Sequence, residues 1–240
     1  IEAWDSRYRH LTVAETLLSA IEQRLAATTR KPESPVALPV PETVNVISAL
    51  DLGLNVPEPS YRKEVNQRQV HLGFLARQLR DRRRSVVLVF EGSDASGKGG
   101  SIRRLTQALD ARFYQVVQIA APTDEELDRP YLWRFWRNLP GWGSLTFFDR
   151  SWYGRVLVER VEGFCSEADW LRAYAEINDF EHQLAEAGAV IVKFWLQISA
   201  DEQLRRFKER EATDFKRFKI TDEDWRNRER WDDYISAACD

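Results

Sequence analysis

The chain has 240 residues, 43% of them hydrophobic, which is enough for one large domain or two small ones with a buried core. Its 35 basic and 38 acidic residues give a formal net charge of −3, which argues against a general nucleic-acid-binding protein. Two distant cysteines and three scattered histidines exclude a disulfide framework and a zinc ribbon, so any metal must be held by oxygen atoms. No run reaches the about eighteen apolar residues of a membrane span, which predicts a soluble protein.

Residues 1–45 divide into two parts with different patterns. Residues 1–29 place apolar side chains mostly at helical spacing between charged residues, which predicts an amphipathic helix. Residues 30–45 contain four prolines and no continuous apolar face, which predicts an extended linker. We therefore expect a boundary there and a main domain over residues 46–240.

The main domain begins with a long helical pattern and then alternates apolar runs with further helical patterns. The first helical pattern covers residues 61–84. Continuous runs typical of strands buried on both faces follow at 85–90, 113–120, 144–148 and 189–198. Helical patterns lie between and after them, at 99–111, 124–139, 167–187, 200–219 and 221–238. This alternation predicts an α/β fold of three layers, with a parallel sheet between helices.

A glycine-rich loop follows the first predicted strand. Residues 92–100 read Gly-Ser-Asp-Ala-Ser-Gly-Lys-Gly-Gly, in the strand-loop-helix setting of a phosphate-binding P-loop. Glycines let successive backbone N–H groups converge on phosphate oxygens, and the lysine adds a positive charge. An ordinary glycine-rich turn is the alternative. The candidate phosphate-binding residues are Gly92, Ser96, Gly97, Lys98, Gly99, Gly100 and Arg103.

Two aspartates are candidate magnesium ligands. Gly99 stands where the general P-loop motif has a Ser or Thr that reaches Mg²⁺, so another residue must hold the metal. Asp94, within the loop, would repel a bound anion unless a cation lay between them. Asp149 ends the strand at 144–148, at the edge where parallel sheets bind ligands. The alternatives are a turn or cap aspartate for Asp94 and a surface salt-bridge cluster around Asp149.

Two groups of basic residues are candidates for binding a phosphate chain. Arg150 and Arg155 follow Asp149 closely, and the guanidinium group suits bidentate binding of phosphate. Residues 205–219 contain seven basic and three acidic residues, a net charge of +4. This charge predicts an anion-binding lid over about residues 205–222, with a solvated charged helix face as the alternative.

Four motifs in this order give the sequence a family resemblance. They are EGSDASGKGG at 91–100, PYLWRFWR at 130–137, FDRSWYGR at 148–155 and VERV at 158–161. Together with residues 194–199 and the charged lid, they resemble the second family of polyphosphate kinases over about residues 61–240. That family has Gly-Lys-Gly-Gly in its loop, so the missing Ser or Thr matches the family pattern.

The resemblance implies a Mg²⁺-dependent bacterial enzyme of the cytoplasm, homo-oligomeric and with a P-loop kinase-like fold. It implies transfer of a terminal phosphoryl group from inorganic polyphosphate to a nucleotide, and no membrane or nucleic-acid partner. Residues 1–9 resemble the closing segment of such a module, which indicates a tandem member that converts AMP to ADP. Residues 1–29 would then be the helical tail of a preceding module, and the module at 46–240 would stop before its own closing segment. The lid residues of the family correspond loosely to Lys208, Arg210 and Lys216.

The expected catalytic roles follow from phosphoryl transfer to a phosphate acceptor. A phosphomonoester has a second pKa of about 6, so AMP needs no general base. We expect Asp94 and Asp149 to hold Mg²⁺ and orient the acceptor, and Lys98 to contact the transferring phosphate. Arg150 and Arg155 would bind its equatorial oxygens. Three other functions stay open: phosphorylation of nucleoside diphosphates by polyphosphate, an ATP-dependent nucleoside monophosphate kinase, and a non-catalytic polyphosphate-binding module.

Overall fold

A computed structural model of the chain describes residues 46–214, 218 and 220–240. They lie in the second of two compact units of the chain, Glu42–Asp240. The helix expected over residues 1–29 and the linker expected over 30–45 fall outside the described residues, and so does Lys216 of the expected lid.

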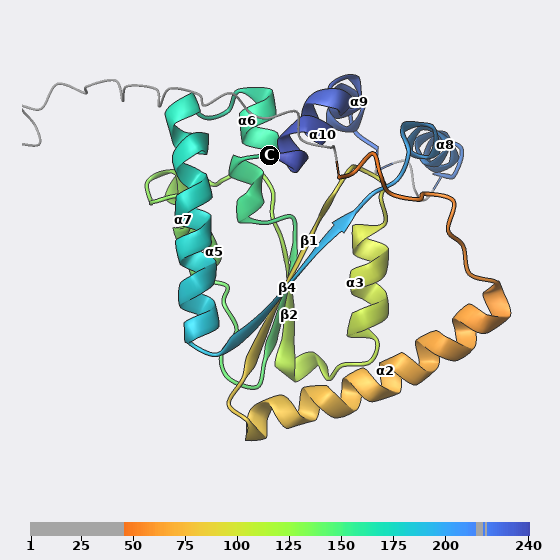
Figure 1. Cartoon of the computed structure of the whole chain (residues 1–240), viewed down its shortest axis with the longest axis vertical. Coiled ribbons are helices and arrows are strands. Elements are labelled where there is room, and N and C mark those ends of the chain that lie inside the picture. The colour runs from red at the N-terminus through yellow and green to blue at the C-terminus, as the bar shows by residue number, and fades with distance from the viewer. Residues whose placement is uncertain (1–45, 215–217, 219) are drawn as a thin grey trace, which may run out of the picture. The chain divides into compact units, whose positions relative to one another are not determined.

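The described part is built on one parallel sheet. Its strands are β1 (Ser85–Gly92), β2 (Tyr114–Gln118), β3 (Leu145–Asp149) and β4 (Ala189–Leu196), in the spatial order β2-β3-β1-β4 (Figure 1). The parallel sheet expected from the four apolar runs is therefore confirmed. In this register Phe90 of β1 lies beside Asp149 of β3. The carboxyl ends of these two strands, and the residues that follow them, meet at one edge of the sheet.

Helices cover both faces of the sheet, as the alternating side chains of β1 require. Val87 and Val89 point to one face, where they pack in a cluster with α7 (Glu167–Glu186). Leu88 and Phe90 point to the other face, where their cluster includes residues of α2 (Glu58–Asp81) and α3 (Lys98–Thr106). The two groups of helices lie on opposite sides of the strands in Figure 1. This arrangement confirms the three-layer α/β/α fold.

Helix α7 shows how sequence determines one of these layers. Ser166 caps its amino end, and Asp169 completes a capping box by accepting a hydrogen bond from the backbone N–H of Ser166. Ala173, Ile177, Phe180 and Leu184, spaced three or four residues apart, are its buried side chains. The helix therefore packs against the sheet through a single apolar face.

The structure corrects several expected helices. The single helix expected at 124–139 is two short helices, α4 (Asp124–Leu127) and α5 (Trp133–Trp136). Pro130 lies between them, and proline supplies no backbone N–H and disfavours helical backbone in the residue before it.

Two more of the expected helices are shorter or divided, and three short elements are additional. The helix expected at 200–219 ends early, as α8 (Ala200–Glu211), and the helix expected at 221–238 is divided at Arg230 into α9 (Asp222–Glu229) and α10 (Trp231–Cys239). The short elements η1 (Ala111–Phe113), η2 (Trp152–Arg155) and α6 (Val158–Glu162) were not expected. Every helix in the described part is too short or too polar to cross a bilayer.

Candidate active site

The glycine-rich loop joins the carboxyl end of β1 to the amino end of α3, the strand-loop-helix setting that its sequence predicts. Gly97 caps α3 with a φ of 109°, a backbone conformation that favours glycine. At Gly92 the φ is 130°, and a Cβ there would lie 2.2 Å from the backbone oxygen of Leu196 in β4. The start of the loop is thus pressed against the neighbouring strand, and only glycine fits.

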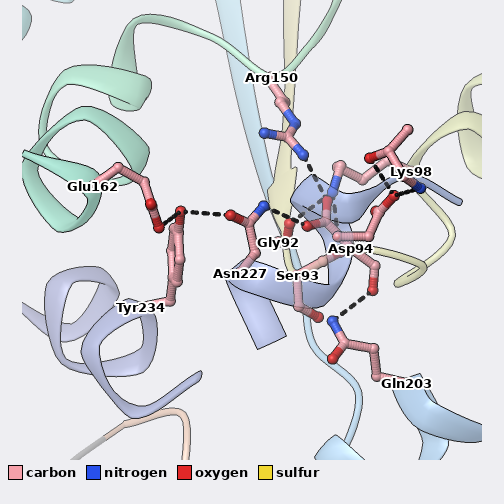
Figure 2. Close-up of polar contacts among 11 residues, drawn as sticks. Gly92, Ser93, Asp94, Lys98, Arg150, Glu162, Gln203, Asn227 and Tyr234 are labelled. Carbon is pink, nitrogen blue, oxygen red and sulfur yellow. Dashed lines mark hydrogen bonds and ion pairs between the residues drawn. The ribbon is translucent and has the colours of Figure 1, made fainter. Parts of the chain in front are cut away.

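Lys98 folds back over the loop from the first turn of α3. Its Nζ donates hydrogen bonds to the backbone oxygens of Gly92 (2.6 Å) and Ser93 (3.1 Å), and the residue is 9% exposed (Figure 2). Burial, followed by the nearby positive charge of Arg150, lowers the pKa of Lys98 below its ordinary value of 10.5. The ammonium group is therefore held inside the loop, where the charge of an anionic ligand would offset the energetic cost of its burial.

Two serine hydroxyls in the loop lack hydrogen-bond partners. The Oγ atoms of Ser93 and Ser96 are buried, and neither has a partner in the described part of the chain. Buried polar groups in proteins are nearly always hydrogen-bonded, so these two hydroxyls indicate a polar ligand in the loop. Ser96 was an expected phosphate-binding residue. Ser93 was not, although its position inside the motif could have indicated it.

Asp94 is held by hydrogen bonds to both of its oxygens. Its Oδ1 accepts from Arg150 Nη2 at 2.6 Å, and its Oδ2 accepts from Asn227 Nδ2 at 2.9 Å (Figure 2). The backbone of Arg150 has a φ of 65°, a left-handed conformation that is uncommon outside glycine, directly after β3. The turn at Arg150 therefore places its guanidinium within hydrogen-bond distance of the Asp94 carboxylate.

Asp149 ends β3 and lies near the first turn of α3. A Cβ placed on Gly99 would be 4.0 Å from its Oδ2, so the carboxylate faces the first turn of α3. Asp94 and Asp149 both act on the Lys98 ammonium, where their negative charges oppose the lowering of its pKa. The structure therefore brings the two expected aspartates to the same lysine.

The carboxylates at the loop could hold a hard cation such as Mg²⁺, whose other ligands would come from a bound substrate. In the described part of the chain, no hydrogen bond or ion pair engages the carboxylate of Asp149, and no cluster of three acidic, histidine or cysteine side chains could form a complete metal cage. Mg²⁺ is commonly held by one or two carboxylates together with substrate phosphates. Asp149 fits this pattern directly. Asp94 fits it through the lone pairs that its two hydrogen bonds leave free.

The two expected arginines lie in different surroundings. Arg150 contacts the loop, whereas Arg155 pairs with Glu159 (Nε to Oε2, 3.1 Å) and stacks 4.1 Å from the centre of the Tyr131 ring. In the described residues, no hydrogen bond or ion pair joins Arg155 to Asp94, Lys98 or Asp149. Only the first of the two arginines is thus in contact with the loop.

Helix α8 contacts the loop through residues other than the expected ones. Gln203 donates to the backbone oxygen of Asp94 (3.1 Å), and Arg206 donates to that of Ala95 (2.9 Å). Lys208 is exposed and Arg210 is partly buried further along α8, and Arg103 is exposed on α3. Gln203 and Asn227 were missed by sequence reasoning. The signal that could have revealed them is an uncharged amide within a highly charged helix.

Glu91 is a further acidic residue at the loop. It accepts a hydrogen bond from the Ser151 hydroxyl at 2.7 Å. Burial raises the pKa of Glu91 above its ordinary value of 4.5, although Ser151, Lys98 and Arg150 favour its ionised form. Above its folded-state pKa, the ionised carboxylate therefore costs stability.

This raised pKa predicts how Glu91→Gln changes stability with pH. The penalty of the wild-type carboxylate is absent below pH 4.5 and develops as pH rises through the folded-state pKa. Glutamine keeps an acceptor for Ser151 without the charge. We expect the unfolding free energy of Glu91→Gln to increase relative to wild type between pH 4.5 and about pH 8. Urea denaturation at both pH values measures this difference, and an equal difference at both would contradict the prediction.

A comparison with known sequences assigns the family. The profile of the family described as Polyphosphate kinase 2 matches residues 55–240. The chain belongs to the polyphosphate kinase 2 family. This confirms the resemblance carried by the four motifs.

Named relatives of this polyphosphate kinase 2 chain agree with that assignment. A polyphosphate:AMP phosphotransferase of Pseudomonas aeruginosa is 54% identical over 243 residues, covering 100% of this chain and 49% of the relative. A polyphosphate:AMP phosphotransferase of Acinetobacter johnsonii is 61% identical over 157 residues, covering 65% of this chain and 33% of the relative. The crystal structure of polyphosphate kinase 2 from Arthrobacter aurescens superposes with a TM-score of 0.76 at 33% identity, covering 80% of this chain and 71% of that one. The chain thus spans half or less of the length of the two phosphotransferases.

Proposed function

We propose that this chain transfers the terminal phosphoryl group of inorganic polyphosphate to AMP, giving ADP. The observation that carries the transfer chemistry is the position of Lys98 in the loop, close enough to Asp94 and Asp149 for both charges to act on it. The same loop holds two buried serine hydroxyls that have no partner among the described residues. The choice of polyphosphate and AMP is supported by the names of the relatives at 54% and 61% identity.

The chemistry requires positioning and charge stabilisation. An oxygen of the AMP phosphate attacks the terminal phosphorus of polyphosphate, the bridging P–O bond breaks, and the shortened polyphosphate leaves with the electron pair. The transition state is loose, so preorganised positive groups supply most of the rate. Lys98 and the backbone N–H groups of the loop would bind the transferring phosphoryl group, and Arg150 would bind its equatorial oxygens. The Ser93 and Ser96 hydroxyls would donate to phosphate oxygens.

We propose Mg²⁺ as the cofactor, with Asp149 and Asp94 as its protein ligands. When bound, the ion would neutralise charge on the phosphate oxygens. The first assignment is supported by the Asp149 carboxylate, which has no hydrogen-bond or ion-pair partner among the described residues. For Asp94, the ligand role has to coexist with the hydrogen bonds from Arg150 and Asn227. A role for Arg155 would require its guanidinium to leave Glu159.

We propose the remaining phosphate-binding residues from their positive charge or from their place in the family's loop motif. Gly92, Gly97, Gly99 and Gly100 would shape the cradle, and Arg103, Lys208, Arg210 and Lys216 would attract the polyanion. We also propose a cytoplasmic location and a homo-oligomeric assembly, both supported by family membership.

Product analysis tests the proposed function against its alternatives. The purified chain is incubated with Mg²⁺, polyphosphate and one acceptor: AMP, ADP or GMP. In a separate arm, it is incubated with Mg²⁺, AMP and ATP, without polyphosphate. We expect ADP from AMP and polyphosphate. Faster formation of triphosphate from ADP would favour a diphosphate acceptor, and ADP formation that requires ATP would indicate a nucleoside monophosphate kinase. Binding of polyphosphate without any product would indicate a non-catalytic module.

A further inference from the structure

Asn227 is a buried amide in the highly charged helix α9. It is 8% exposed, and its Nδ2 donates to Oδ2 of Asp94 at 2.9 Å. Its Oδ1 lies 3.3 Å from the hydroxyl of Tyr234 in α10. The labelled side chains in Figure 2 form a continuous row from Glu162 through Tyr234 and Asn227 to Asp94. The row links the carboxyl-terminal helices to the P-loop.

The neighbours of Asn227 determine which way its amide points. An amide has one end that donates and one end that accepts. The donor end faces the Asp94 carboxylate, which can only accept when ionised, and the other end faces the Tyr234 hydroxyl, whose single proton also lies within reach of Glu162. The reverse orientation would place the amide oxygen against the Asp94 carboxylate. Asp94 therefore selects the orientation in which the amide nitrogen of Asn227 faces the loop.

Tyr234 is itself anchored by a buried acid. Its hydroxyl lies 3.2 Å from Oε1 of Glu162, whose side chain is 6% exposed and also pairs with Arg226 (3.1 Å) of α9. Burial, followed by the charge of Glu162, raises the pKa of Tyr234 above its ordinary value of 10. The hydroxyl therefore keeps its proton at neutral pH, and that single proton is shared between Glu162 Oε1 and Asn227 Oδ1.

The backbone of the loop is held separately from the Asp94 side chain. Gln203 binds the backbone oxygen of Asp94, and Arg206 binds that of Ala95, which has a left-handed φ of 61°. Neither contact fixes the carboxylate. Its orientation depends on Arg150 at one oxygen and on Asn227 at the other.

We propose that Asn227 is a positioning residue for Asp94, with Tyr234 and Glu162 holding the far end of its amide in place. Asn227 and Arg150 grip the two oxygens of the carboxylate from different elements, α9 and the turn after β3. The carboxylate is thus preorganised for the role proposed above, and this inference rests on that proposed function. Because α9 follows the expected lid in the chain, the contact also makes the site depend on how the carboxyl-terminal helices pack.

Turnover measurements test the inference. We expect Asn227→Ala to lower kcat about tenfold, with a smaller change in KM for AMP, because the lost hydrogen bond orients a reacting-site group and does not bind the acceptor. Asn227→Asp should lower kcat further, to about a hundredth of wild type, because it places a second carboxylate against Asp94. We expect Tyr234→Phe to lower kcat less than Asn227→Ala does. A kcat of Asn227→Ala within about twofold of wild type would overturn the proposal.

A double-mutant cycle separates positioning from general damage. Asp94→Asn alone should lose most of the turnover. If Asn227 acts through Asp94, adding Asn227→Ala to Asp94→Asn should change the residual kcat by less than about twofold. Independent, multiplying effects would overturn the proposal.

Matched controls exist elsewhere in the chain. Asn138 donates its amide to the backbone oxygen of Arg134 (2.8 Å), and the Tyr174 hydroxyl accepts from Arg160 (3.1 Å). Asn138→Ala and Tyr174→Phe each remove one side-chain hydrogen bond that does not involve the loop. Both should keep kcat within about twofold of wild type.

A measurement without substrate keeps this inference distinct from the proposed function. The same cycle of Asn227→Ala and Asp94→Asn is repeated on the unfolding equilibrium in urea. We expect a coupling of about tenfold in the unfolding constant, the size of a hydrogen bond to a charged group. If the wild type shows no turnover with any acceptor, the proposed function fails while this coupling still decides whether Asn227 holds Asp94. Additive effects on unfolding would show that it does not.

Discussion

Lys98→Met is expected to lower kcat about a thousandfold while the domain stays folded. The lysine is the only side chain in the described part that donates a charged hydrogen bond to the backbone of the loop at both Gly92 and Ser93. Arg150 pairs with Asp94, and Arg206 pairs with Glu202 and binds the Ala95 backbone oxygen, so neither occupies the place of the Lys98 ammonium. Steady-state assays with AMP, polyphosphate and Mg²⁺ measure the effect. A variant with more than about a tenth of wild-type kcat would remove Lys98 from the proposed chemistry.

The same variant should also change how the stability of the domain depends on pH. Because the folded state lowers the pKa of Lys98, the charged ammonium costs stability at neutral pH. That cost is fully present below the folded-state pKa and disappears as pH rises toward 10.5. Methionine fills the same space without charge. The unfolding free energy of wild type should therefore rise relative to Lys98→Met as pH increases toward 10.5, measured by urea denaturation.

Gly92→Ala should destabilise the domain by about 3 kcal/mol or more. The added Cβ would lie 2.2 Å from the oxygen and 2.9 Å from the nitrogen of Leu196, and both are backbone atoms of β4. A flexible side chain could move away, but a paired strand cannot move without breaking its hydrogen bonds to β1. The φ of 130° adds strain for any residue with a Cβ. Chemical denaturation measures the loss.

Gly141→Ala is the matched control for Gly92→Ala. A Cβ on Gly141 would have no other atom within 4 Å. We expect its unfolding free energy to stay within about 0.5 kcal/mol of wild type. Similar losses for both variants would mean that the close approach of β1 and β4 is unimportant.

The sheet was predictable because its signals are local. Val87 and Val89 belong to one face and Leu88 and Phe90 to the other, so the strand is apolar throughout, and this property is visible in four consecutive letters. The breaks between helices were less visible. Pro130 indicates the break between α4 and α5, whereas no proline or glycine stands at Arg230, where α9 ends.

The site was predictable only where its parts lie in short motifs. Lys98 and Asp149 each stand in a motif next to a strand end, so their meeting follows from the parallel sheet. Arg150 and Arg155 looked equivalent in sequence, but the left-handed turn at Arg150 separates their surroundings. Asn227 reaches Asp94 from a distant helix, and no local pattern encodes a contact that depends on packing of the whole carboxyl-terminal segment.

The order of strands in the sheet has a consequence during synthesis. β1 carries the P-loop, yet both strands that flank it come later in the chain, and its first residue, Ser85, pairs with Ala189 of the last strand. A nascent chain that has emerged only through β3 therefore leaves one edge of an apolar strand unpaired. Such edges are templates for aggregation and targets for chaperones. The loop contacts β4 at Leu196, so we expect a chain that stops before this strand to aggregate and not to fold around a complete loop.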